Sequence, residues 1–166
     1  MKTRVPVILF VASLLLAALA AFAQGKAPGG NPVPYPEGYR SWTHVKSMWL
    51  GSKHALATPF AGLHHVYGND AAVAALKSKK PFPKGAVLVF DLFEAPLDGE
   101  AIAEGKRKFT GVMHRDDRLY KETGGWGFEA FAQDSKVERL VNDKGTSCFA
   151  CHQSRSAQDF VFTELR

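Results

Sequence analysis

Two cysteines and a histidine stand together near the C-terminal end of the chain, in the run Cys148-Phe149-Ala150-Cys151-His152. This C-x-x-C-H spacing is that of the attachment motif for c-type haem. Two thiols three residues apart lie on one side of a helical turn, where each can form a thioether with a haem vinyl group. The histidine behind them can then ligate the iron. The motif predicts one covalent haem c, attached through Cys148 and Cys151, with His152 as the axial iron ligand.

Other uses of these three residues fit the sequence less well. A structural zinc site usually needs four cysteine or histidine ligands, and the chain has no second cysteine pair. A thioredoxin-like redox pair is expected beside a β-α-β pattern, and no such pattern flanks Cys148. A disulfide between Cys148 and Cys151 would close a very small loop and leave His152 unexplained.

The N-terminus has the pattern of a secretory signal peptide. Lys2 and Arg4 precede an almost wholly apolar run over 5–20, and an A-x-A cleavage site ends at Ala23. The run is short for a membrane span, which needs about 20 residues. We therefore predict a cleaved signal peptide over 1–23, export to the periplasm, and no membrane attachment afterwards.

The remaining chain has the length of one ordinary domain. Residues 24–38 are rich in glycine and proline and predict an extended leader, followed by a haem domain over 39–166. Loss of Lys2 and Arg4 lowers the formal net charge from +5 to about +3. The basic residues are scattered, so the sequence does not support nucleic-acid binding.

Hydrophobic periodicity predicts a mixture of helices and strands. The predicted helices cover 39–53, 71–79 and 135–141, and the predicted strands cover 63–67, 86–93, 106–114 and 126–131. The strands disfavour both the all-helical small cytochromes and the four-helix bundles. The expected fold class is α+β: a single domain with a mainly antiparallel β-sheet and a few flanking helices.

Short segments along most of this domain resemble the cytochrome P-460 family, which includes the β-sheet cytochromes c′ (cytochrome c′-beta). They are YRSW at 39–42, HVYGN at 65–69, PKG at 83–85, VLV at 87–89, GGWGF at 124–128, CFACH at 148–152 and DFVFT at 159–163. The resemblance implies an antiparallel sheet with flanking helices and a homodimer. It also implies one five-coordinate haem, with histidine on its proximal side and an open distal side.

The family has two branches that differ in the distal pocket. The cytochromes P-460 proper carry a lysine cross-linked to the porphyrin and oxidise hydroxylamine. The cytochromes c′-beta lack the cross-link, have phenylalanines on the distal side and bind nitric oxide. Phe90 stands where the resemblance places the lysine, and no lysine occurs between Lys84 and Lys106. The resemblance thus favours the c′-beta branch, with Phe90 and Phe60 as an apolar distal cap over a haem that binds nitric oxide and carbon monoxide.

Two other functions stay open, so the sequence does not decide whether the protein is an enzyme. In a hydroxylamine-oxidising enzyme, the candidate cross-linking residues are Lys84 and Lys106 and the candidate proton acceptors are Glu129 and His114. In a six-coordinate electron-transfer cytochrome, the candidate sixth ligands are His44, His54, His64, His65 and His114. The candidate partners are the two gases, a second copy of the chain and a redox partner protein.

Overall fold

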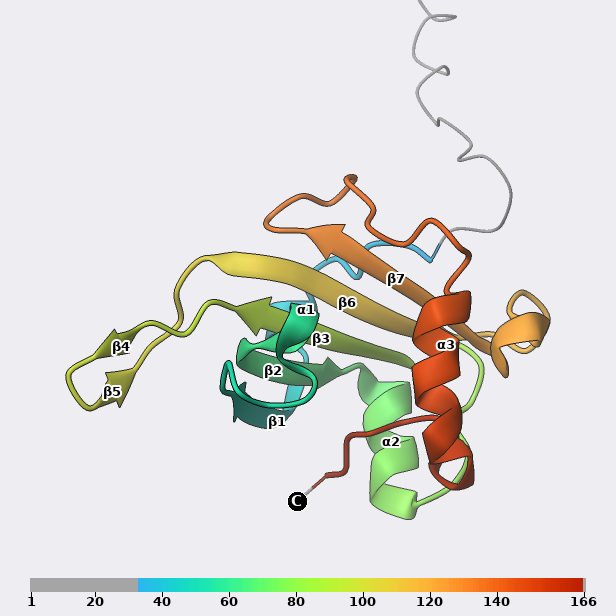
Figure 1. The fold of residues 1–166 in the computed structure, drawn as a ribbon. Coiled ribbons are helices and arrows are strands. Elements are labelled where there is room, and N and C mark those ends of the chain that lie inside the picture. Colours follow the sequence, from blue (N-terminus) through green and yellow to red (C-terminus); the bar gives the residue numbers. More distant parts are fainter. Residues whose placement is uncertain (1–32, 166) are drawn as a thin grey trace, which may run out of the picture. The chain divides into compact units, whose positions relative to one another are not determined.

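Five antiparallel strands form one sheet in the computed structural model, which describes residues 33–165 (Figure 1). Their order across the sheet is β1-β2-β3-β6-β7, and they span Thr43–Leu50, Gly62–Gly68, Val87–Phe93, Arg107–Arg115 and Trp126–Ala132. A small hairpin of β4 (Leu97–Asp98) and β5 (Ala101–Ile102) interrupts the connection from β3 to β6. The predicted signal peptide, and the predicted leader as far as residue 32, lie outside the described residues.

Three α-helices lie on the same side of this sheet, which we name the helix face (Figure 1). They are α1 (Ala57–Phe60), α2 (Asp70–Ser78) and α3 (Thr146–His152), and the 3-10 helices are η1 (Tyr39–Ser41), η2 (Lys121–Thr123) and η3 (Gln153–Gln158). None of the helices between residues 33 and 165 is long and apolar enough to cross a membrane. The α+β prediction, a mainly antiparallel sheet with few helices in a single domain, is confirmed.

The main core lies between the helix face and the two longer helices. Leu88, Trp126 and Phe128 of the sheet are buried against Ala72 and Ala75 of α2. α2 begins at Asn69, whose side chain accepts a hydrogen bond from the backbone N–H of Ala72 (3.0 Å), as an N-cap residue does.

A second cluster packs on the opposite side of the sheet, which we name the Asp91 face. It contains Val112 and Phe131 of the sheet together with Val33. The end of the predicted leader therefore packs onto the sheet.

The helix predicted over 39–53 is wrong, because most of that segment forms the edge strand β1. Val45 and Leu50 are buried, whereas Trp49 is 52% exposed. A β-bulge between His44 and Lys46 shifts the alternation, so the apolar spacing no longer shows the period of two typical of a strand. Pairing with β2 satisfies the backbone N–H and C=O groups of this segment, which contains β-branched and aromatic residues.

The helix predicted over 135–141 is also wrong. Ser135 Oγ accepts hydrogen bonds from the backbone of Val137 and Glu138, which makes a turn. The chain then runs back along β7, where Arg139 forms a bridge with Phe131. Backbone pairing with a neighbouring strand outweighs the helical preference of this short segment.

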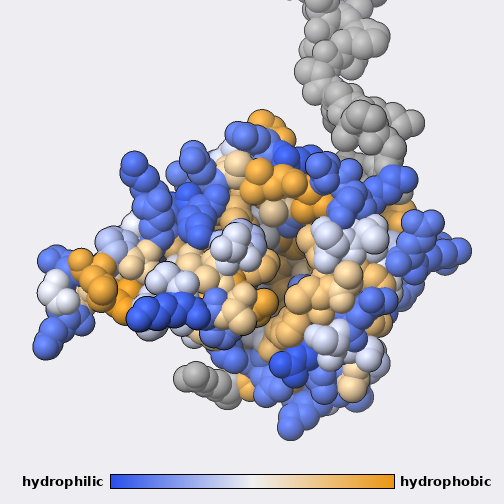
Figure 2. All heavy atoms as spheres, viewed as in Figure 1, coloured by the Kyte–Doolittle hydropathy of each residue, from blue (hydrophilic) through white to orange (hydrophobic). Residues whose placement is uncertain are grey.

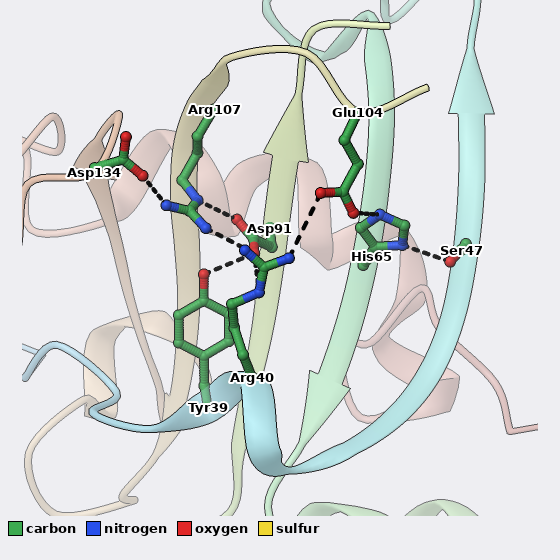
Figure 3. A network of polar contacts seen from close by, with 8 residues as sticks. All are labelled: Tyr39, Arg40, Ser47, His65, Asp91, Glu104, Arg107 and Asp134. Carbon is green, nitrogen blue, oxygen red and sulfur yellow. Dashed lines mark hydrogen bonds and ion pairs between the residues drawn. The ribbon is translucent and has the colours of Figure 1, made fainter. Parts of the chain in front are cut away.

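A network of charged and polar side chains centred on buried Asp91 occupies the Asp91 face (Figure 3). The carboxylate of Asp91 is fully buried and accepts hydrogen bonds from Tyr39 Oη (2.7 Å) and Arg107 Nε (2.7 Å). Burial, with the adjacent carboxylate, raises the pKa of Tyr39, so its hydroxyl stays protonated and keeps donating. Asp91 therefore anchors both η1 and β6 to the central strand.

Replacement of Asp91 by asparagine should strongly destabilise the fold. The change removes the buried carboxylate partner of half-buried Arg107 and leaves it only the exposed Asp134, and breaking a buried ion pair from one side costs about 3–5 kcal/mol. Chemical denaturation would measure the loss in the free energy of unfolding. Glu37→Gln is the matched control, because it breaks an exposed pair with Lys136 and should leave the midpoint close to that of the parent. Equal effects of the two substitutions would contradict the anchoring role of Asp91.

Candidate haem-binding site

Helix α3 presents both cysteines and the histidine of the C-x-x-C-H motif. It packs on the helix face through half-buried Cys148 and Phe149, which contact the main core cluster. Both thiols are free, and Cys151 is exposed. Burial raises the pKa of Cys148, which favours the neutral thiol. The structure thus brings the three predicted residues together on one helix, with the two thiols three residues apart.

His152 is held so that one ring nitrogen is available as a ligand. Its Nδ1 lies 2.7 Å from the carbonyl oxygen of Phe160. A carbonyl can only accept, so Nδ1 carries the proton and Nε2 has the free lone pair. Burial lowers the pKa of His152 and keeps the ring neutral. A hydrogen bond of this kind fixes the tautomer of a metal-binding histidine and increases its basicity.

The loop that supplies this carbonyl is anchored by Asp159, a residue to which no motif in the sequence assigns a role. Asp159 and Phe160 both have positive φ angles (52° and 66°). The Asp159 carboxylate accepts hydrogen bonds from the backbone N–H of Phe82 (2.8 Å) and from Arg115 Nη1 (3.2 Å). Its carbonyl accepts one from Trp126 Nε1 (2.9 Å). These contacts hold the loop in the conformation that places the Phe160 carbonyl at His152.

Three phenylalanines meet on the same face of the sheet, away from α3. Phe60 of α1 lies 6.1 Å, centroid to centroid, from both Phe90 of β3 and Phe109 of β6, and the latter two rings are 5.9 Å apart. We name these three rings the phenylalanine cluster. Phe60 and Phe90, predicted as a pair from distant segments, are thus in contact. Phe109 was missed, because its position depends on the pairing of β6 with β3.

Figure 2 shows a hollow in the helix face between α1 and α3, bordered by hydrophobic side chains. Strand alternation directs Val66, Phe90 and Met113 to this face, and all three are half-buried. Gly111 lies opposite Phe90 on β6, and a Cβ atom at Gly111 would meet no atom closer than 3.5 Å. The hollow, two thiols on one helix and a neutral histidine with a free Nε2 fit a haem c.

The residues considered for an enzymatic site lie elsewhere. Lys84 forms an ion pair with Asp116 (3.0 Å), and Lys106 is exposed at the start of β6. Glu129 accepts a hydrogen bond from Arg139, and strand alternation places it on the Asp91 face.

The candidate sixth ligands are scattered in the same way. His44 and His65 lie against Tyr67, and His114 lies against Tyr120, all on the Asp91 face. His54 is exposed in the loop before α1. His64 alone of these candidates lies on the helix face, where its ring is 4.6 Å from that of Phe90.

The donor set and the apolar hollow place this chain in the class of c-type haem proteins. A family model described as Cytochrome P460 matches residues 36–163, which is most of the chain. The chain therefore belongs to the cytochrome P460 family, and this membership implies haem c as its cofactor. The match is to the family as a whole and does not distinguish its branches. A comparison with curated proteins gave no match.

Replacement of Asp159 by asparagine should loosen the loop beside His152. Asparagine tolerates the positive φ angle, so the change mainly removes the charge that Arg115 and the Phe82 N–H contact. We expect a loss of about 1–2 kcal/mol in the free energy of unfolding, measured by denaturation. Asp117→Asn is the matched control, because Asp117 contacts the same arginine but is 67% exposed, and its loss should cost at most about 0.5 kcal/mol. If the control were as destabilising as Asp159→Asn, the anchoring role would be refuted.

Proposed function

We propose that the protein is a periplasmic monohaem cytochrome whose five-coordinate haem binds nitric oxide, and also carbon monoxide. The observation that supports this most strongly is the meeting of Phe60, Phe90 and Phe109 on the sheet face that also carries His152. Such an arrangement suits a haem with a histidine on one side and an apolar cap on the other. Membership in the family supports the haem.

The two cysteines and the histidine of the motif would hold the haem. The thiols of Cys148 and Cys151 would each hold the haem on α3 through a thioether, formed by addition of S–H across a vinyl double bond. His152 would supply Nε2 to the iron, while its Nδ1–H donates a hydrogen bond to the Phe160 carbonyl oxygen. The haem supplies the iron at which a gas binds.

The phenylalanine cluster would keep that gas site free of water. Its rings offer neither a strong donor nor an acceptor, so a water molecule gains little there, whereas nitric oxide and carbon monoxide are nearly neutral and lose little solvation. Phe60 is 37% exposed and stands at the edge of the cluster, on the short helix α1. We propose that Phe60 controls entry of the gas.

Several positions argue against the enzymatic alternative. Lys84 is paired with Asp116 and Lys106 is exposed just before β6, while the candidate proton acceptors Glu129 and His114 lie on the Asp91 face. Lys108 approaches α1, but its ammonium donates hydrogen bonds to the carbonyl oxygens of Pro59 and Ala61 (2.8 Å each). An intact-mass measurement of the holoprotein tests for a lysine–haem cross-link directly.

We also propose export by a cleaved signal peptide and assembly as a homodimer. The edge strand β1 carries Met48 and Trp49, which are 47% and 52% exposed, and such a strand offers a surface for a second copy. Light scattering of the mature protein would measure its mass in solution. A monomeric mass at micromolar concentration would reject the dimer.

The decisive experiment is an absorption spectrum of the dithionite-reduced holoprotein before and after addition of nitric oxide. A high-spin haem c spectrum that changes with the gas is expected. A Soret band near the wavelength that names the family would instead indicate the cross-linked enzyme. A low-spin spectrum that is indifferent to the gas would indicate a sixth protein ligand and an electron carrier.

Replacement of Phe60 by alanine should accelerate gas binding. The change opens the edge of the phenylalanine cluster, so the association rate of carbon monoxide should rise several-fold in flash photolysis, with little loss of stability because Phe60 is partly exposed. Leu56→Ala is the control, since Leu56 precedes α1 and is 49% exposed. An unchanged rate in Phe60→Ala would exclude a gating role for Phe60.

A further inference from the structure

His64 is buried, and its ring nitrogens have no hydrogen-bond partner within the described range 33–165. The side chain is only 5% exposed, and neither Nδ1 nor Nε2 has a hydrogen-bond partner among the described residues. A neutral imidazole has one donor and one acceptor, and leaving both unpaired in the interior costs stability. Buried polar groups without partners are rare in native proteins, and each one requires an explanation.

The position of His64 connects it to the phenylalanine cluster. It lies on β2 opposite Leu92, and strand alternation directs it to the helix face, as it does Val66 and Phe90. Its ring packs against Phe90 in a T-shaped arrangement, with 4.6 Å between centroids and 74° between planes. A contact of an N–H group with an aromatic ring is weaker than an ordinary hydrogen bond and leaves the acceptor nitrogen unpaired.

The neighbouring residue, His65, differs from His64 in its polar contacts. His65 points to the Asp91 face, where Nδ1 forms a hydrogen bond with Ser47 Oγ (2.6 Å) and Nε2 lies at ion-pair distance from Glu104 (2.8 Å), without the geometry of a hydrogen bond (Figure 3). Polar side chains are thus within reach of a histidine on that face, whereas buried His64 packs against the ring of Phe90. His64 is thus a polar side chain beside the phenylalanine cluster.

His64 is neutral under ordinary conditions. Burial lowers its pKa to about 4, and the nearby His65 and Lys46 act in the same direction. A neutral ring can donate one N–H group without bringing a charge into the apolar pocket.

We propose that His64 is the hydrogen-bond donor of the gas-binding pocket and donates its ring N–H to a diatomic ligand held on the capped side of the haem. This inference rests on the proposed function. A donor there stabilises the partial negative charge that the outer atom of a bound diatomic molecule acquires. The pocket would therefore favour nitric oxide over carbon monoxide, because carbon monoxide acquires less charge.

The test compares wild-type holoprotein with His64→Leu and His64→Gln, using the C–O stretching frequency of the carbon monoxide adduct in the infrared. Leucine removes the donor, so the frequency should rise. Glutamine keeps an N–H donor, so its frequency should stay nearer that of the wild type. Identical frequencies in wild type and His64→Leu would overturn the role of His64 while leaving gas binding intact. A wild-type protein that binds no gas would overturn the proposed function, and this inference with it.

A second measurement separates this role from a structural one. The ring nitrogens of His64 have no hydrogen-bond partner in the part of the chain that the structure describes, so His64→Leu should be more stable than the wild type in thermal unfolding. A lower melting temperature for His64→Leu would show that His64 serves the fold and would overturn the inference.

The pH dependence of stability provides an independent test with the same two proteins, wild type and His64→Leu. The folded pKa of about 4 lies below the value of 6.5 for an unperturbed histidine, so between these values the unfolded chain takes up a proton that the folded protein does not. Wild-type stability should therefore fall more than that of His64→Leu as the pH is lowered from 7 to 5. Equal losses in the two proteins would show that His64 is not enclosed as proposed.

Discussion

Side-chain alternation along β3 is the constraint on which both faces of the sheet depend. β3 is paired on both edges, with β2 and β6, so its register cannot slip without moving every side chain to the wrong face. Phe90 thereby joins the phenylalanine cluster, and the next residue, Asp91, joins a buried ion pair with Arg107. The phenylalanine cluster and a buried carboxylate are thus separated by the thickness of one strand.

The side of the candidate site that carries His152 depends on a different kind of constraint. The C-x-x-C-H motif brings His152 next to the cysteines, but the motif does not decide which ring nitrogen faces the haem. That choice is made by the Phe160 carbonyl, in a loop with two successive positive φ angles. The Asp159 contacts with Arg115, Trp126 and the Phe82 backbone stabilise that loop. The environment of the proposed iron ligand therefore depends on residues from three separate segments.

Much of the fold could be predicted because its signals are local. The strands expected at 63–67, 86–93, 106–114 and 126–131 each agree with the structure to within one residue, and α2 is shifted by one. The two wrong helices share a cause, since in both segments backbone pairing with another strand outweighs the local pattern. For the candidate site, the haem motif and the pair Phe60 and Phe90 could be anticipated. Phe109 and Asp159 could not, because their roles arise only from contacts between distant segments.

The sequence by itself determined the features that depend on near neighbours: the spacing of the two thiols and the histidine, the alternation of the central strands, and the α+β composition of the fold. Backbone geometry sets these over a few residues. The tertiary structure decided which side chains meet. It separated adjacent His64 and His65 onto opposite faces and removed Glu129 and His114 from the candidate site. Such outcomes depend on strand register and on how loops return to the sheet, and neither is encoded in any single segment.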